Sequence, residues 1–151
     1  MAYKQVLIAV DLTDEAEEVM TAARNVTGDS GAKVHLLTVI RPLARIYGGL
    51  DMAPMAANAL TFEEEAIKQA EKQLTALGGV FDVGQQDTHV RVGSPAAEIK
   101  AFADEHSVDL IVMGTHGRHG LGLLLGSTAN AVLHGVPCDV LAVKVQQMEV
   151  S

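Results

Sequence analysis

The sequence predicts an α/β fold in which one open, parallel, five-stranded sheet carries helices on both faces. Short apolar runs alternate with segments of helical periodicity along the whole chain, as in successive right-handed βαβ units. The chain is 48% hydrophobic but only 3% aromatic, so its core consists of aliphatic residues that suit helices packed on a parallel sheet. Its 151 residues fit a single domain, which we take to span residues 1–151.

The first half of the chain predicts two strands and a helix. Residues 5–10 form an apolar run that ends at Asp11, and Thr13 or Asp14 can cap the helix that follows. That helix is indicated by apolar residues at helical spacing, namely Ala16, Val19, Met20 and Ala23. Glycines in residues 28–31 end it, and residues 34–40 form the second apolar strand.

Residues 41–59 are expected to form a long irregular connection, because they contain two prolines and two adjacent glycines. Connections of this length in compact domains tend to be functional or mobile. The next helix is predicted to begin at Thr61-Phe62-Glu63-Glu64, which fits a capping box, and to end at Gly78 and Gly79. Its apolar face is formed by Ile67, Ala70, Leu74 and Leu77.

The second half predicts three strands and two helices. Residues 88–92 alternate as expected for an edge strand, and Ser94-Pro95 indicates a helix start with proline at the first helical position. Ile99, Phe102 and Ala103 are expected to face the core. The fourth strand, the last helix and the fifth strand are predicted at residues 109–113, 127–134 and 139–143.

The most informative motif is Ile111-Val112-Met113-Gly114-Thr115-His116-Gly117, followed after eight residues by Gly126-Ser127-Thr128. It predicts a buried strand with a sharp turn at its carboxyl end, and then the amino terminus of a helix. Glycines let backbone amides approach an anion, and a helix amino terminus adds donors and a favourable dipole. Ligands of open parallel sheets bind beyond the carboxyl ends of the strands. The motif therefore indicates a phosphate-binding site of a nucleotide-binding protein.

Several segments together resemble the universal stress protein family. They are Tyr3-Lys4-Gln5-Val6-Leu7-Ile8-Ala9-Val10-Asp11, Leu36-Leu37-Thr38-Val39-Ile40, Val92-Gly93-Ser94-Pro95 and the stretch of residues 109–144. The resemblance covers nearly the whole chain except residues 41–59. It implies the strand order 3-2-1-4-5 and a homodimer in which the last strands pair across a two-fold axis.

The glycine motif resembles that of the family's ATP-binding branch, which implies a set of ligand contacts. Ala9, Val10, Asp11 and Val39 would lie at the adenosine end, and Met113 and Gly114 would line the nucleoside. His116 and Gly117 would approach the ribose or the phosphates, which Gly126, Ser127 and Thr128 would hold. The spacer of residues 118–125 is one residue shorter than the family pattern. This departure leaves ADP and AMP open beside ATP.

Some of these residues also have simpler interpretations. Asp11 can cap the following helix, His116 can be an exposed turn residue, and Ser127 and Thr128 are good helix caps on any interpretation. Residues 1–12 look most like the family's other branch, which lacks the glycines and does not bind ATP.

Two functions therefore follow from the resemblance. The leading one is an ATP-binding regulatory module that reports stress or energy state to partner proteins. We expect Mg²⁺ to accompany the nucleotide, because phosphate charge on an acidic protein needs compensation. Hydrolysis is expected to be slow at most, since no general base is evident and Arg118 is the main cation near the motif. The alternative is a dimeric interaction module that binds no nucleotide.

An enzyme that transfers adenylyl or phosphoryl groups would need a second pocket, for which only residues 41–59 offer room.

Composition argues against several other classes. The net charge of -8 disfavours nucleic-acid binding, and no apolar run reaches the length of a membrane span. The amino terminus lacks the features of a signal peptide, so we expect a cytoplasmic protein. Cys138 is the single cysteine and is expected to be a small core residue. His106, His119 and His134 lack metal-ligand spacing.

Overall fold

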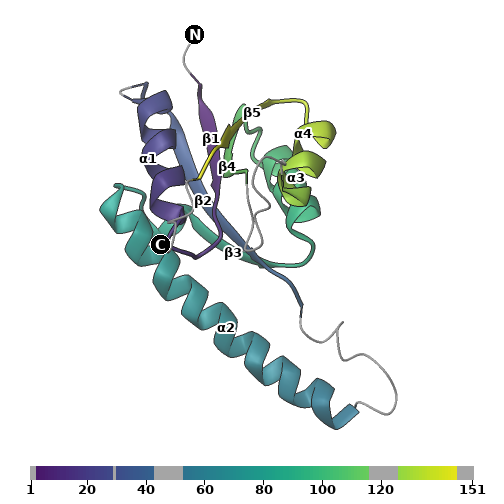
Figure 1. The fold of residues 1–151 in the computed structure, drawn as a ribbon. Coiled ribbons are helices and arrows are strands. Elements are labelled where there is room, and N and C mark those ends of the chain that lie inside the picture. The colour runs from purple at the N-terminus through teal and green to yellow at the C-terminus, as the bar shows by residue number, and fades with distance from the viewer. Residues whose placement is uncertain (1–2, 29, 43–52, 116–125, 146–151) are drawn as a thin grey trace, which may run out of the picture.

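The computed structural model describes residues 3–28, 30–42, 53–115 and 126–145. It contains one sheet of five strands in the order β3-β2-β1-β4-β5, and every neighbouring pair is parallel. The strands are β1 (Gln5–Ala9), β2 (Lys33–Ile40), β3 (Thr88–Val92), β4 (Leu110–Gly114) and β5 (Asp139–Val143). The predicted fold class and strand order are therefore confirmed (Figure 1).

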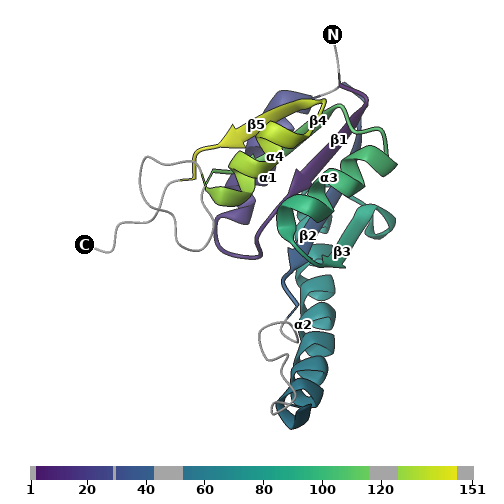
Figure 2. The ribbon, with the colours of Figure 1, turned by 90° about the vertical axis from the view of Figure 1, so that its right-hand side faces the viewer.

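The helices cover both faces of this sheet, as predicted (Figure 2). They are α1 (Ala16–Thr27), α2 (Ala53–Val80), α3 (Pro95–Glu105) and α4 (Ser127–Gly135), with a short 3₁₀ helix, η3 (Gln85–Asp87), before β3. Side chains alternate between the faces along each strand. In β1, Val6 and Ile8 pack with α1 and α2, whereas Leu7 and Ala9 pack with α3 and α4.

Burial separates the inner strands from the edge strands. Residues of β1 and β4 are almost fully buried, because helices cover these strands on both faces. Residues of β3 are half-buried throughout, which confirms the predicted edge position of this strand. β5 forms the opposite edge, and its residues are half-buried or exposed.

The predicted start of the second helix is wrong. α2 begins at Ala53, so residues 53–59 are helical instead of irregular, and Thr61 lies inside the helix instead of capping it. Alanine-rich sequence has high helix propensity, and Pro54 is tolerated in a first turn because its missing amide has no intrahelical acceptor there. The amino-terminal half of α2 projects beyond the sheet (Figures 1 and 2). Residues 43–52 of the expected connection lie outside the described residues.

One predicted cap also differs from the structure, and another agrees with it. α1 begins at Ala16 with Glu15 in the cap position, and Thr13 only accepts a hydrogen bond from the Glu15 amide through its hydroxyl (3.4 Å). Ser94 occupies the cap position of α3 with Pro95 at the first helical position, as predicted; its carbonyl accepts the Glu98 amide (2.9 Å) in the first intrahelical bond, and its side chain makes no capping hydrogen bond. Among the described residues, no helix is both long enough and apolar enough to span a bilayer.

Candidate functional site

The ends of three neighbouring strands gather the residues predicted to bind the nucleoside. Ala9 pairs with Leu37 of β2 on one side and with Met113 of β4 on the other. This register brings the carboxyl end of β1 between those of β2 and β4, so the predicted residues of all three strands share one edge. The parallel sheet order, which sequence spacing alone cannot fix, creates this arrangement.

Within this edge, the residues differ in how far they reach the surface. Ala9, Val10 and Met113 are buried, whereas Val39 and Gly114 are half-buried and Asp11 is exposed. The main chain of Val10 is engaged with β2, since its amide donates to the Leu37 carbonyl (3.0 Å) and its carbonyl accepts the Thr38 hydroxyl (2.9 Å). The exposed carboxylate of Asp11, two residues after β1, is therefore a polar group available at this end of the strand.

Asp11 does not act as the cap of α1. That helix begins at Ala16, its cap residue is Glu15, and no side chain caps it by a hydrogen bond. The capping role that the sequence left open for Asp11 is absent from the described part of the structure.

The amino terminus of α4 lies against the end of β4. The Thr115 amide donates to the carbonyl of Val143 (2.9 Å), and the Thr115 carbonyl accepts the Gly126 amide (2.5 Å). These two bonds tie β5, β4 and the start of α4 together. The predicted phosphate-binding helix terminus therefore stands beside the predicted nucleoside-binding strand ends.

The first turn of α4 offers two of the three predicted phosphate donors. The amides of Ser127 and Thr128 have no acceptor within the helix, because they precede the first intrahelical bond, which runs from Asn130 to the carbonyl of Gly126. The Gly126 amide, in contrast, is already bonded to Thr115. A phosphate can recruit this amide only by replacing that bond.

Thr115 is a candidate that the sequence motif contained but did not single out. Its hydroxyl is buried and has no hydrogen-bond partner in the described structure. A buried hydroxyl without a partner costs about 1–3 kcal/mol, and such groups are rare in native proteins. Its position between Gly114 and the start of α4 marks a place that a polar ligand atom would satisfy.

Two cations also lie at this edge of the sheet. Arg41 follows β2 directly and Lys144 follows β5 directly, and both side chains are exposed. Neither residue belongs to the glycine motif in the sequence, and only the sheet order brings both to its side. His116, Gly117 and the spacer of residues 118–125 lie outside the described residues.

An open, doubly wound parallel sheet with a helix amino terminus beside its carboxyl edge defines a Rossmann-like α/β protein. A model of the universal stress protein family matches residues 2–144, and the chain belongs to this family.

Individual relatives agree with this assignment. Universal stress protein A homolog 1 of Coxiella burnetii is 38% identical over 143 residues, which cover 95% of this chain and 97% of the relative. The universal stress protein UspA from Lactobacillus plantarum has a TM-score of 0.74 and 26% identity, with 97% and 99% of the two chains covered. A universal stress protein solved in complex with cAMP has a TM-score of 0.58 and 27% identity, with 97% and 100% covered.

Proposed function

We infer that this protein binds an adenine nucleotide at the carboxyl edge of its sheet and acts as a stress- or energy-responsive regulatory module. The observation that carries this proposal is the meeting of the β1, β2 and β4 ends with the open first turn of α4. The related protein that was solved with cAMP, also an adenine nucleotide, supports it.

The residues divide into two groups by the chemistry they offer. The half-buried Val39 presents apolar surface for a base, and the buried Met113 belongs to the same hydrophobic cluster, while Asp11 can accept hydrogen bonds from a ribose hydroxyl. Ser127 and Thr128 offer amides to phosphate oxygens, and Thr115 offers its unpaired hydroxyl. ATP is the expected ligand, with ADP and AMP as alternatives.

Mg²⁺ would arrive with the phosphates of the nucleotide. Among the described residues, no group of three His, Cys, Asp or Glu side chains is arranged to hold a metal ion. Mg²⁺ commonly binds through substrate phosphates and one or two carboxylates, and Asp11 is the exposed carboxylate at this edge. We propose slow hydrolysis at most, because Asp11, the exposed carboxylate among the described edge residues, is assigned to the ribose or to Mg²⁺ and not to an attacking water.

A homodimer through β5 is the proposed assembly. Within the described residues β5 pairs only with β4, so its outer edge carries main-chain groups that another strand can pair with. Sedimentation velocity on the full chain measures this directly, and a monomer at micromolar concentration would contradict it.

A dimeric interaction module without a nucleotide is the second candidate. The similarity of the chain to universal stress protein A homolog 1 of Coxiella burnetii favours this candidate. So does the Gly126 amide, which already donates to the Thr115 carbonyl and is not free for a phosphate. Calorimetric titration with Mg-ATP, ADP, AMP and cAMP separates the two functions. Saturable binding of any of them supports the nucleotide site, and no heat at millimolar ligand supports the module.

A further inference from the structure

Three histidines from different elements form a cluster beneath the carboxyl-terminal end of α3. His35 lies on β2, His89 lies on β3, and His106 directly follows α3. Their ring centroids are 5.0 Å apart for His35 and His106, 5.7 Å for His35 and His89, and 6.0 Å for His89 and His106. We call these three residues the histidine cluster.

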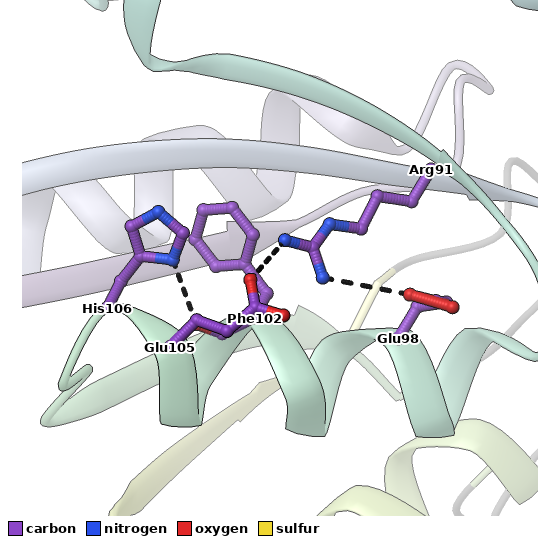
Figure 3. A network of polar contacts seen from close by, with 5 residues as sticks. All are labelled: Arg91, Glu98, Phe102, Glu105 and His106. Carbon is purple, nitrogen blue, oxygen red and sulfur yellow. Dashed lines mark hydrogen bonds and ion pairs between the residues drawn. The ribbon is translucent and has the colours of Figure 1, made fainter.

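The fully buried ring of Phe102 joins the cluster to α3. It stacks on His106 at a centroid distance of 4.0 Å and lies 4.8 Å from His89 and 5.3 Å from His35. Figure 3 shows the stacked rings of Phe102 and His106 at the end of this helix. The cluster is therefore the surface on which the last turn of α3 rests against the β2–β3 side of the sheet.

The hydrogen bonds of the cluster fit neutral imidazoles. His106 donates from Nδ1 to the Phe102 carbonyl (3.1 Å), and His35 donates from Nε2 to the Gln5 side-chain oxygen (3.2 Å). The Nδ1 atom of His35 and the Nε2 atom of His89 are buried without a hydrogen-bond partner in the described structure. A proton added to either atom would be a buried donor with no acceptor.

The charges around the cluster do not compensate an added proton. Lys33 pairs with Asp87 at 3.0 Å. Arg91 lies over the Phe102 ring at 4.9 Å and pairs with Glu105 and, at 3.7 Å, with Glu98 (Figure 3). The carboxylates of η3 and α3 that face the cluster are thus already bound to cations.

The carboxylate that follows α3 in sequence is also engaged. Asp109 accepts the amides of Lys4 and Gln5 at 2.9 Å and 3.0 Å.

These surroundings disfavour the charged forms of His35 and His89. Burial is the main cause that lowers the pKa of His35 and of His89, and repulsion from His106 adds to it in both. Lys33 lowers the pKa of His35 further, Arg91 lowers that of His89, and Asp87 opposes both changes.

We propose that the histidine cluster is an acid-sensitive latch, which holds the last turn of α3 on β2 and β3 while His35 and His89 are neutral and releases it when they are protonated. The direction of this pH dependence follows from the linkage between proton binding and release of the helix. Unfolded or released histidine binds a proton near its ordinary pKa of 6.5, above the pKa of the packed form. The latch is therefore complete above pH 6.5 and weakens as the pH falls below that value.

Amide hydrogen exchange on the full chain tests this proposal. Protection factors, which correct for the intrinsic pH dependence of exchange, are compared at pH 7.5 and 5.5 for α1 and for the last turn of α3. We expect protection in α3 to fall by up to about tenfold more than in α1 for each of His35 and His89, since one pH unit below the free pKa changes the equilibrium about tenfold. The H35Q and H89Q variants should each lose the contribution of the histidine that is replaced.

The variant H134Q is the matched control, because His134 is exposed on α4 and outside the cluster. It should behave like the wild type. Equal loss of protection in α1 and α3, or an unchanged α3 response in both cluster variants, overturns the latch. If H35Q and H89Q do not fold, imidazole titration by NMR in the wild type decides: His35 and His89 must titrate below the ordinary histidine pKa of 6.5, and titration at or above that value refutes the proposal.

Discussion

Replacing the buried hydroxyl of Thr115 by a methyl group should raise stability and weaken nucleotide binding at once. In the free protein this hydroxyl has no partner in the described structure, so Thr115→Val removes a desolvation cost of about 1–3 kcal/mol at nearly constant volume. We expect the free energy of unfolding to increase by about 1 kcal/mol. If the bound nucleotide satisfies the hydroxyl, its affinity should fall about 2- to 12-fold, the equivalent of one neutral hydrogen bond.

Thr38→Val is the matched control for stability, because it makes the same chemical change at another buried threonine. The Thr38 hydroxyl donates to the carbonyl of Val10 at 2.9 Å, and the residue is only 5% exposed. Its removal leaves that carbonyl without this donor, so unfolding should become easier by about 1–2 kcal/mol. The two substitutions therefore have opposite predicted signs.

Urea denaturation followed by circular dichroism measures both stabilities, and calorimetry with Mg-ATP measures affinity. Thr75→Val on α2 controls for binding, because Thr75 is not among the residues predicted to contact the nucleotide. A Thr115→Val protein that loses stability as Thr38→Val does would show that the hydroxyl has a partner in solution. An unchanged nucleotide affinity would remove Thr115 from the site.

Three further predictions test other parts of the structure. Gly126→Val and Gly117→Val should both abolish nucleotide binding and preserve the fold; at Gly126 the φ of -59° and ψ of 153° suit any residue. Gly79→Val is the control in the calorimetric titration, because a side chain at Gly79 meets open space. Normal nucleotide binding by both site variants would refute the motif. Asp109→Ala should lower the free energy of unfolding, measured by urea denaturation, by about 1.5–3 kcal/mol, because the charged acceptor of two backbone amides is lost. A decrease below about 0.5 kcal/mol would show that water takes the place of the carboxylate. Ala142→Glu on β5 should give a monomer in sedimentation velocity, because a charge within an edge strand disfavours pairing. A persistent dimer would place the interface elsewhere.

The strands and most helices could be predicted because their signals are local. The continuous apolar run that ends at Val10 requires burial on both faces, which only an inner strand of a helix-covered sheet provides. The capping box at Thr61 failed because the same residues fit a helix interior, and nothing in its spacing shows that the preceding alanines continue the helix. Local pattern thus fixes the type of an element better than its ends.

The candidate site was predictable in part for a related reason. Asp11, Val39 and Gly114 could be assigned to strand ends from the sequence, and the sheet order then made these ends neighbours. The orphan hydroxyl of Thr115 depends on packing that no motif encodes. His106 was considered with His119 and His134, whereas its actual neighbours are His35 and His89. His35 and His89 are more than fifty residues apart in the sequence, and only the parallel pairing of β2 with β3 brings them together.

The candidate nucleotide site and the histidine cluster occupy different ends of the same strands, and α3 is the element that extends between them. His35 lies near the amino end of β2, whereas Val39 lies near its carboxyl end. α3 begins at Pro95 beyond the carboxyl end of β3, ends above the cluster, and packs along α4, whose first turn offers the phosphate donors. Because coupling between two sites is reciprocal, a nucleotide that fixes α4 against α3 would also favour the neutral latch. A pH dependence of nucleotide affinity that disappears in H35Q would identify α3 as the connection, and one that persists would assign it to the phosphates themselves.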